Sequence, residues 1–185
     1  MISKPEIVLI GGGGHCKSCI DVLETEGKYK IVGIVDVQEK LNEKVLGYKI
    51  FATDKDLPKL SRQYKNYLIT IGQIKTAEPR KKIANILNKL EVNFPVIISP
   101  KSHVSKFSKI GQGTIIMHNV VVNAAAVIGE NCIINTSSII EHDARVGNFC
   151  HISTGAIING GTAIGRETFI GSNSMLREYI NVGEQ

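Results

Sequence analysis

The feature that most constrains this sequence is a six-residue period in its second half. From Ile98 to Val182 every sixth residue is a medium-sized aliphatic residue, and a small residue follows four positions after nearly every one of them. Neither an α-helix nor an alternating β-strand has this period. A hexapeptide repeat with one aliphatic and one small inward position predicts a parallel β-helix. A β-solenoid without catalytic function is the alternative interpretation of the same pattern.

A glycine repeat gives the length of one coil. Glycines recur every eighteen residues, which is three hexapeptides, at Gly111, Gly129, Gly147, Gly165 and Gly183. The spacing therefore predicts a triangular coil of eighteen residues, and about five such coils. We expect a positive φ at this glycine corner. We expect the same at the next corner, where asparagine tolerates the left-handed region and the residues are Asn123, Glu141, Asn159 and Arg177.

Composition and charge narrow the class of protein. The chain has no Trp, a hydrophobic fraction of 43% and no apolar run near the roughly 20 residues that span a bilayer. The N-terminus has no signal-peptide pattern, so we expect a cytoplasmic protein. The net charge of +5 is spread along the chain and favours small anionic ligands. Aromatic residues interleaved with arginines are missing, so nucleic-acid binding is not expected.

The first part of the chain has a different pattern. Residues 7–10 form an apolar run, residues 11–14 are four glycines, and residues 16–26 have helical periodicity. A second apolar run over 29–35 ends at Asp36. This order of strand, glycine loop, helix, strand and acidic residue predicts a βαβ unit. The N-terminus of its helix can bind phosphate, and the acidic residue can reach a ribose or uracil.

Further elements complete an N-terminal domain over residues 1–95, which precedes the β-helix domain over 96–185. Residues 67–72 read as a third parallel strand and 78–91 as a helix. The full dinucleotide fingerprint is not met, because Cys16 stands where the third glycine should be. The pattern therefore favours a single nucleotide over NAD, with a glycine turn that binds no ligand as the alternative.

The cysteines and histidines are the side chains that could have redox, metal-binding or catalytic roles. Cys132 and Cys150 are eighteen residues apart at small inward positions, and we expect reduced packing residues there. Cys16 and Cys19 form a Cys-x-x-Cys at a helix start, but the surrounding pattern is not that of a redox protein. The histidine spacing does not provide three convergent imidazoles, so no metal site is expected. His142 lies between Glu141 and Asp143 and is an outward residue that could be chemical or simply solvated.

The order of these segments resembles a known family. A glycine-rich N-terminal domain, a hexapeptide β-helix and the motifs over residues 13–15, 135–143 and 146–153 are similar to bacterial sugar acetyltransferases. These include a UDP-4-amino-sugar N-acetyltransferase and sialic acid O-acetyltransferases. The resemblance covers essentially the whole chain and implies a Rossmann-like α/β domain followed by a left-handed parallel β-helix.

The resemblance also implies roles for individual residues. His142 matches the catalytic base, and Asp143 matches the carboxylate that orients it, although close relatives tend to have Glu there. His151 matches a residue that contacts acetyl-CoA, and Gly160 lies in the coil that lines the same groove.

Other positions match the part of the family that binds the acceptor. The residues that fall where relatives hold a uridine nucleotide are Gly13, Gly14, His15 and Asp36. The family works as a homotrimer with active sites between neighbouring β-helices. Relatives usually run on for further coils beyond the position of Gly183, so we expect weak acetyl-CoA affinity in this chain.

The expected activity is therefore transfer of acetyl from acetyl-CoA to the amino group of a UDP-linked amino sugar. A histidine with a pKa near neutrality suits deprotonation of the attacking amine. Acetyl transfer to a hydroxyl of sialic acid is the second enzymatic hypothesis. An inactive nucleotide-binding scaffold is the hypothesis from a different class.

Overall fold

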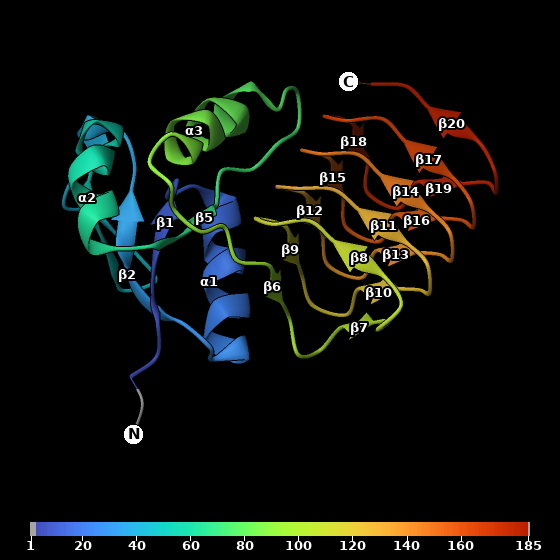
Figure 1. Cartoon of the computed structure of the whole chain (residues 1–185), viewed down its shortest axis with the longest axis horizontal. Helices are drawn as coiled ribbons and strands as arrows, with labels where there is room; N and C mark the ends of the chain where they lie inside the picture. The colour runs from blue at the N-terminus through green and yellow to red at the C-terminus, as the bar shows by residue number, and fades with distance from the viewer. Residues whose placement is uncertain (1–2, 185) are drawn as a thin grey trace. The chain divides into compact units, whose positions relative to one another are not determined.

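The computed structural model describes residues 3–184, which form two compact units. One unit contains the chain up to Gly72 together with Glu78–Pro95. The other contains Gln73–Ala77 and the chain from Val96 onward. The short segment Gln73–Ala77 therefore belongs to the second unit although the chain on both sides of it belongs to the first (Figure 1).

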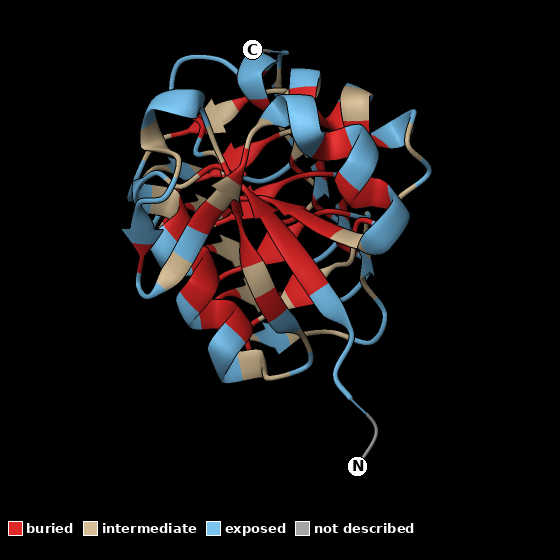
Figure 2. Ribbon diagram, turned by 90° about the vertical axis from the view of Figure 1, so that its left-hand side faces the viewer, coloured by how far each residue is buried: buried red, intermediate tan, exposed pale blue. Residues whose placement is uncertain are grey.

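The first unit is a mostly parallel α/β sheet in the strand order β3-β4-β2-β1-β5, with only β3 antiparallel to its neighbour. Its strands are β1 (Glu6–Ile10), β2 (Lys30–Val35), β3 (Lys44–Val45), β4 (Tyr48–Ala52) and β5 (Asn66–Ile69). Its helices are α1 (Gly14–Glu26), α2 (Leu57–Gln63) and α3 (Glu78–Asn88), with 3₁₀ turns η1 (Gln38–Lys40) and η2 (Asp54–Asp56). The strands are buried at the centre of this unit (Figure 2). This is the predicted Rossmann-like arrangement.

The carboxyl ends of β1 and β5 are tied to each other by backbone and side-chain contacts. Gly11 has φ 102°, and a Cβ there would lie 2.5 Å from Cγ1 of Ile71. Only glycine therefore allows β5 to pass this close to the glycine loop. The Thr70 hydroxyl donates to the carbonyl oxygens of Ile10, at 3.0 Å, and Gly11, at 2.6 Å. Strand β5 consequently ends at Ile69, three residues before the predicted end.

Helix α1 begins two residues earlier than predicted. Gly13 is its N-cap residue, so Gly14 is already helical. The cap makes no side-chain hydrogen bond, and the first turn has no acidic residue. No side chain of the cap residue therefore covers the N-terminus of α1, where the helix dipole favours an anion.

The second unit is a left-handed parallel β-helix of triangular section, as predicted. Fifteen two-residue strands form three five-stranded parallel sheets in which each residue pairs with the residue eighteen positions later. The first face contains β6 (Ile97–Ile98), β9 (Ile115–Ile116), β12 (Ile133–Ile134), β15 (His151–Ile152) and β18 (Phe169–Ile170). The second face contains β7 (His103–Val104), β10 (Val121–Val122), β13 (Ile139–Ile140), β16 (Ile157–Ile158) and β19 (Met175–Leu176). The third face contains β8 (Lys109–Ile110), β11 (Val127–Ile128), β14 (Arg145–Val146), β17 (Ala163–Ile164) and β20 (Asn181–Val182).

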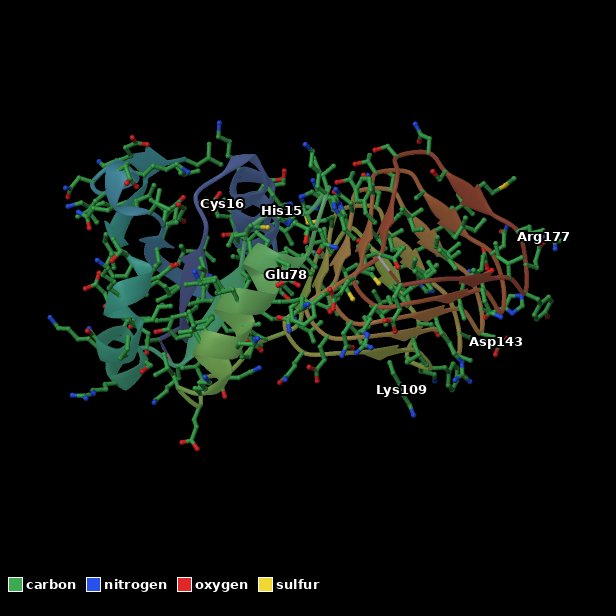
Figure 3. The ribbon with its side chains drawn as sticks, turned by 90° about the horizontal axis from the view of Figure 1, so that it is seen from above. His15, Cys16, Glu78, Lys109, Asp143 and Arg177 are labelled. Atoms are coloured by element: carbon green, nitrogen blue, oxygen red, sulfur yellow. The ribbon has the colours of Figure 1, made fainter. Side chains whose placement is uncertain are left out.

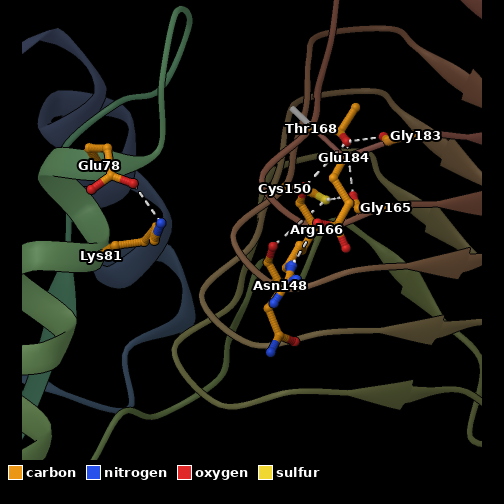
Figure 4. Close-up of polar contacts among 9 residues, drawn as sticks. All are labelled: Glu78, Lys81, Asn148, Cys150, Gly165, Arg166, Thr168, Gly183 and Glu184. Carbon is orange, nitrogen blue, oxygen red and sulfur yellow. Dashed lines mark hydrogen bonds and ion pairs between the residues drawn. The ribbon is translucent and has the colours of Figure 1, made fainter.

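The predicted inward positions form the core of this β-helix. Ile116, Ile134 and Ile152 are fully buried on one face, and the small residues Cys132 and Cys150 are fully buried beside them. Each thiol donates a hydrogen bond of 3.0 Å to a carbonyl oxygen of the next coil, Cys132 to Gly147 and Cys150 to Gly165. Figure 4 shows the second of these bonds. Both cysteines are free thiols, which confirms their prediction as reduced packing residues.

The predicted backbone conformation of two corners is wrong. None of the glycines of the eighteen-residue repeat has a positive φ, and neither does Asn123 or Glu141. From Ile110 to Leu176, the left-handed residue of each corner is instead the third after the inward aliphatic residue. Glycine occupies it at Gly113, Gly155 and Gly161, and other residues occupy it at Asn119, Ala125, Asn131, Ser137, Asp143, Phe149, Glu167, Asn173 and Tyr179.

The repeated glycines are required because successive coils approach closely. A Cβ on Gly147 would lie 2.6 Å from the backbone N and 2.8 Å from the Cα of Arg166 in the next coil. A Cβ on Gly111 would lie 2.5 Å from the carbonyl carbon of Gly129. Glycine recurs at this position because any side chain would clash with the next coil. The conformational freedom of the glycine backbone is not the reason.

No helix among residues 3–184 is long and apolar enough to cross a membrane.

Candidate active site

The corner between β13 and β14 carries the predicted catalytic pair. His142 and Asp143 are the two turn residues there, and their side chains are 57% and 62% exposed. Nδ1 of His142 lies 2.8 Å from Oδ2 of Asp143. Because a carboxylate only accepts, Nδ1 carries the hydrogen and Nε2 presents a lone pair. Asp143 lies on the outer surface of the β-helix (Figure 3).

The same turn favours the protonated form of the imidazole. The hydrogen bond that Nδ1 donates to Asp143 raises the pKa of His142 above its ordinary value, and the negative charges of Asp143 and Glu141 act in the same direction. Glu141 does not touch the imidazole but accepts a hydrogen bond of 2.6 Å from Nδ2 of Asn123 in the preceding coil. Asp143 therefore contributes both orientation and charge, whereas Glu141 contributes charge alone.

Gly160 makes room for the imidazole. It occupies the position eighteen residues after His142, and a Cβ there would lie 2.7 Å from Cε1 and 2.8 Å from Nε2 of His142. The backbone of the two turns is joined by a hydrogen bond of 3.0 Å from Gly161 N to the His142 carbonyl oxygen. The structure thus brings together three of the predicted residues, His142, Asp143 and Gly160.

His151 lies apart from this group, on the first face, and is only 7% exposed. Its Nδ1 donates to the carbonyl oxygen of Gln73 at 2.6 Å, and its Nε2 accepts from Nδ2 of Asn135 at 3.1 Å. Its ring also meets the Phe169 ring edge-on at 5.1 Å. These contacts show His151 holding the segment Gln73–Ala77, and its contact with acetyl-CoA stays a prediction.

Two of the four residues predicted to hold the nucleotide, Gly13 and Asp36, line a cavity in the first unit, whereas Gly14 and His15 are not among its lining residues. The cavity has a volume of about 380 Å³ and lies at the carboxyl ends of the parallel strands. Gly11 and Gly13 of the glycine loop and Asp36 line it. Its size is in the range of small-ligand pockets, and the carboxyl edge of a parallel sheet is where such folds bind ligands.

Asp36 holds the glycine loop in place. Its Oδ2 accepts from the Gly12 N–H at 2.6 Å and lies 3.2 Å from Nζ of Lys40, while its Oδ1 accepts from the Val37 N–H at 2.7 Å. Burial acts to raise the pKa of the Asp36 carboxyl, but these donors outweigh burial and hold the pKa below its ordinary value. The predicted contact of Asp36 with a ribose or uracil stays a prediction.

His15 lies in the first turn of α1, together with the cysteines Cys16 and Cys19 of the same helix. Nε2 of His15 lies 3.3 Å from Sγ of Cys19, one helical turn later. Cys16 and Cys19 are fully buried, and burial raises the pKa of both thiols. Neither thiol is activated as a redox cysteine would be. Figure 3 labels His15 and Cys16 at the start of α1.

Two charged residues of the cavity were missed by the sequence analysis. Asp54 follows β4, and Lys82 lies on α3. Asp54 could have been found, because it follows an apolar run whose carboxyl end belongs to the same sheet edge. Lys82 gives no such signal, since it is one of two adjacent lysines of α3.

No group of three or more metal-binding side chains was found among residues 3–184.

Comparisons with known proteins agree with this geometry. Residues 6–87 match the family described as the PglD N-terminal domain, and residues 107–142 match bacterial transferase hexapeptide repeats. No curated protein sequence matches the chain significantly.

The chain is similar in structure to the acetyltransferase domain of PglB from Neisseria gonorrhoeae in complex with acetyl coenzyme A. The identity is 31%, the TM-score is 0.89, and the match covers 98% of this chain and 86% of that domain. It is also similar to a histidine-to-asparagine variant of perosamine N-acetyltransferase from Caulobacter crescentus in complex with CoA and GDP-perosamine. There the identity is 28%, the TM-score is 0.81, and the match covers 98% of this chain and 92% of that one.

A histidine-to-alanine variant of the Caulobacter crescentus enzyme gives 26% identity and a TM-score of 0.82, with 98% of this chain and 92% of that one covered. The identity with the PglB domain extends over nearly the whole chain and includes both units. The protein therefore belongs to the family of bacterial sugar acetyltransferases built on a left-handed hexapeptide-repeat β-helix.

Proposed function

We propose that this protein transfers the acetyl group of acetyl-CoA to the amino group of a nucleotide-linked sugar. The observation that carries this proposal is the His142–Asp143 pair, whose Nε2 lone pair makes no hydrogen bond within residues 3–184. Relatives contain acetyl-CoA in one case and CoA with GDP-perosamine in another, which supports the two substrates. The resemblance favours UDP as the nucleotide, whereas the Caulobacter crescentus relative holds a GDP-sugar.

The proposed chemistry is direct transfer with His142 as general base. The sugar amine attacks the thioester carbonyl carbon and forms the new C–N bond, and Nε2 of His142 takes the amine proton. The carbonyl oxygen becomes an oxyanion. Collapse of this intermediate breaks the C–S bond, and the imidazolium returns the proton to the departing thiolate. Asp143 stabilises the imidazolium through its bond to Nδ1.

A donor for the oxyanion is available in the neighbouring turn. The N–H of Gly160 makes no hydrogen bond within residues 3–184, and Gly160 lies against the imidazole. We assign it as the backbone donor, because such donors stabilise the charge that develops in acyl transfer.

The four free cysteines suit a reducing compartment, so we place the reaction in the cytoplasm.

The pH dependence of the reaction tests the role of Asp143. The base acts only when His142 is neutral, so activity rises with pH through the raised pKa of His142. Asp143→Asn removes the main cause of that rise, and we expect the ascending limb of kcat/KM to move to lower pH. Loss of the fixed tautomer should lower the plateau roughly tenfold. The measurement is a pH profile of kcat/KM.

Glu141→Gln is the matched control, because Glu141 contributes charge but does not hydrogen-bond the imidazole. It should shift the limb less and leave the plateau unchanged. An Asp143→Asn profile that overlays the wild type would show that Asp143 does not act on the base.

The second face supports the homotrimer expected from the resemblance. Its outward residues form an apolar column over four coils, in the register Val121, Ile139, Ile157 and Met175. Met175 is 68% exposed, and the other three are half-buried. We propose that this column packs against another copy of the chain, because contiguous apolar surface of this kind marks an interface.

Ile157→Glu tests that contact. A carboxylate in the centre of the column would be desolvated at an interface, so we expect light scattering to give a smaller species than the wild type at equal concentration. Leu46→Glu is the control, since Leu46 is 58% exposed in the first unit, outside the column. An Ile157→Glu protein that keeps the wild-type mass would place the interface elsewhere.

The function itself is tested by thiol release from acetyl-CoA with a panel of acceptors, and His142→Ala as the control. Histidine-dependent turnover with a UDP- or GDP-linked amino sugar supports the proposal. Turnover only with sialic acid or another hydroxyl acceptor makes the protein an O-acetyltransferase. Nucleotide-sugar binding without thiol release from any acceptor makes it a binding scaffold.

A further inference from the structure

The cavity of the first unit contains two kinds of charged side chain. Four charged residues line it, namely Asp36, Lys40, Asp54 and Lys82. Asp36 and Lys40 form an ion pair of 3.2 Å, and Asp36 also accepts two backbone hydrogen bonds. Asp36 therefore already has partners in the glycine loop, and Lys40 is paired with Asp36.

Asp54 and Lys82 are not engaged in this way. Neither makes a hydrogen bond or an ion pair with any of residues 3–184, although both line the cavity. They interact only through space, because the Lys82 charge acts to lower the pKa of Asp54 while burial, the larger effect, raises it. A carboxylate and an ammonium that face one cavity without pairing can each take a group of the ligand.

The backbone under Asp54 is fixed by its neighbours. Thr53 and Asp56 form a capping box in which the Asp56 carboxylate accepts from the Thr53 N–H at 2.8 Å and from its hydroxyl at 3.0 Å. Asp54 is the first residue of η2, inside this box. The backbone that carries the Asp54 carboxylate is thus held at the edge of the cavity.

Lys82 comes from the other side of the sheet edge. It lies on α3, whose residues Pro79 and Ile83 line the same cavity. Apolar residues make up most of the remaining wall, including Val35 and Ile71. A charged or polar ligand group in this cavity can therefore pair with only a few side chains.

We propose that Asp54 and Lys82 recognise the nucleotide of the sugar substrate, whereas Asp36 positions the glycine loop. Asp54 accepts a hydrogen bond from an O–H or N–H group of the nucleoside. Lys82 pairs with an oxygen of the diphosphate, near Gly13 at the N-terminus of α1, where the helix dipole favours an anion. This inference rests on the proposed nucleotide-sugar function, which it extends to two residues outside the family resemblance.

Calorimetry on the full chain separates the two roles, with uridine, UDP, guanosine and GDP as probes. Asp54→Asn should weaken the nucleoside and its diphosphate by the same factor, roughly tenfold, because it acts on the part they share. Lys82→Gln should weaken the diphosphate roughly fivefold and leave the nucleoside unchanged. Lys82→Arg should retain diphosphate binding, since the charge remains.

Matched controls guard against a general effect of charge. Lys55→Gln and Glu43→Gln change exposed groups that do not line the cavity and should leave all affinities unchanged. Asp36→Asn should differ from Asp54→Asn by lowering the melting temperature as well, because it weakens the carboxylate's hydrogen bonds from the Gly12 and Val37 N–H groups and removes its ion pair with Lys40.

The outcomes distinguish this inference from the function on which it rests. If neither UDP nor GDP binds the wild type, the nucleotide-sugar function itself fails. If a diphosphate binds the wild type and binds Asp54→Asn and Lys82→Gln equally well, the function stands and this inference is wrong. The nucleoside that binds also identifies the base.

Discussion

Replacing Gly160 by alanine is expected to lower kcat for acetyl transfer roughly 100-fold, because the added methyl group would displace the imidazole of His142, the proposed general base. The new Cβ would lie 2.7 Å from Cε1 and 2.8 Å from Nε2 of His142, closer than such atoms can approach. The imidazole is exposed, so it can swing outward and relieve the clash. It would then lose its bond to Asp143 and its alignment with the thioester. Steady-state thiol release measures the effect.

The same exposure predicts little change in stability for Gly160→Ala. The melting temperature should stay within a few degrees of the wild type, since no backbone atom has to move. Gly171→Ala is the control, because its Cβ would meet only Oγ of Ser174, at 3.5 Å. Equal kcat values for Gly160→Ala and Gly171→Ala would show that the position of His142 against Gly160 is not used in catalysis.

Replacing Gly147 by alanine is expected to give the largest loss of stability among these variants. Its Cβ would lie 2.6 Å from N and 2.8 Å from Cα of Arg166, and both are backbone atoms of the next coil. A coil cannot move away without breaking its ladder to both neighbours. Overpacking of this kind costs about 3 kcal/mol, or roughly 6–12 °C in melting temperature for a chain of this size.

Gly183 provides a control within the same column of the repeat. It lies eighteen residues after Gly165, but a Cβ there meets nothing within 4 Å. Gly183→Ala should therefore melt like the wild type. Thermal unfolding of both variants tests the explanation, because equal losses at Gly147 and Gly183 would point to backbone conformation instead of coil spacing.

Much of the β-helix could be predicted from the sequence because its repeat leaves few alternatives. The six-residue period identifies the inward residues, and the eighteen-residue period identifies the residues that pair between coils. The backbone of the corners could not be predicted in the same way. A glycine signals either a positive φ or a close approach, and the sequence alone does not separate the two. At Gly111 and Gly147 the cause is close approach.

The candidate site divides along similar lines. His142 and Asp143 are adjacent in sequence, so their contact requires only the correct rotamers. Gly160 follows His142 by eighteen residues, which is one coil, so the repeat predicts that the two are neighbours. Asp54 and Lys82 reach one cavity from separate elements, and no sequence period links them. The burial of His151 depends on Gln73, 78 residues earlier, which the sequence gives no means of anticipating.

The placement of Gln73–Ala77 limits how this protein can be divided or recombined. These residues lie between β5 and α3 of the first unit, but Gln73 makes two hydrogen bonds within the second, from His151 and to the Glu167 carbonyl oxygen. A single crossover near residue 95 would give a β-helix that lacks its own five-residue segment. The buried Nδ1–H of His151 would then have lost its acceptor. Exchanging the first units of such enzymes thus calls for two junctions in the N-terminal gene segment and matched residues on the first face.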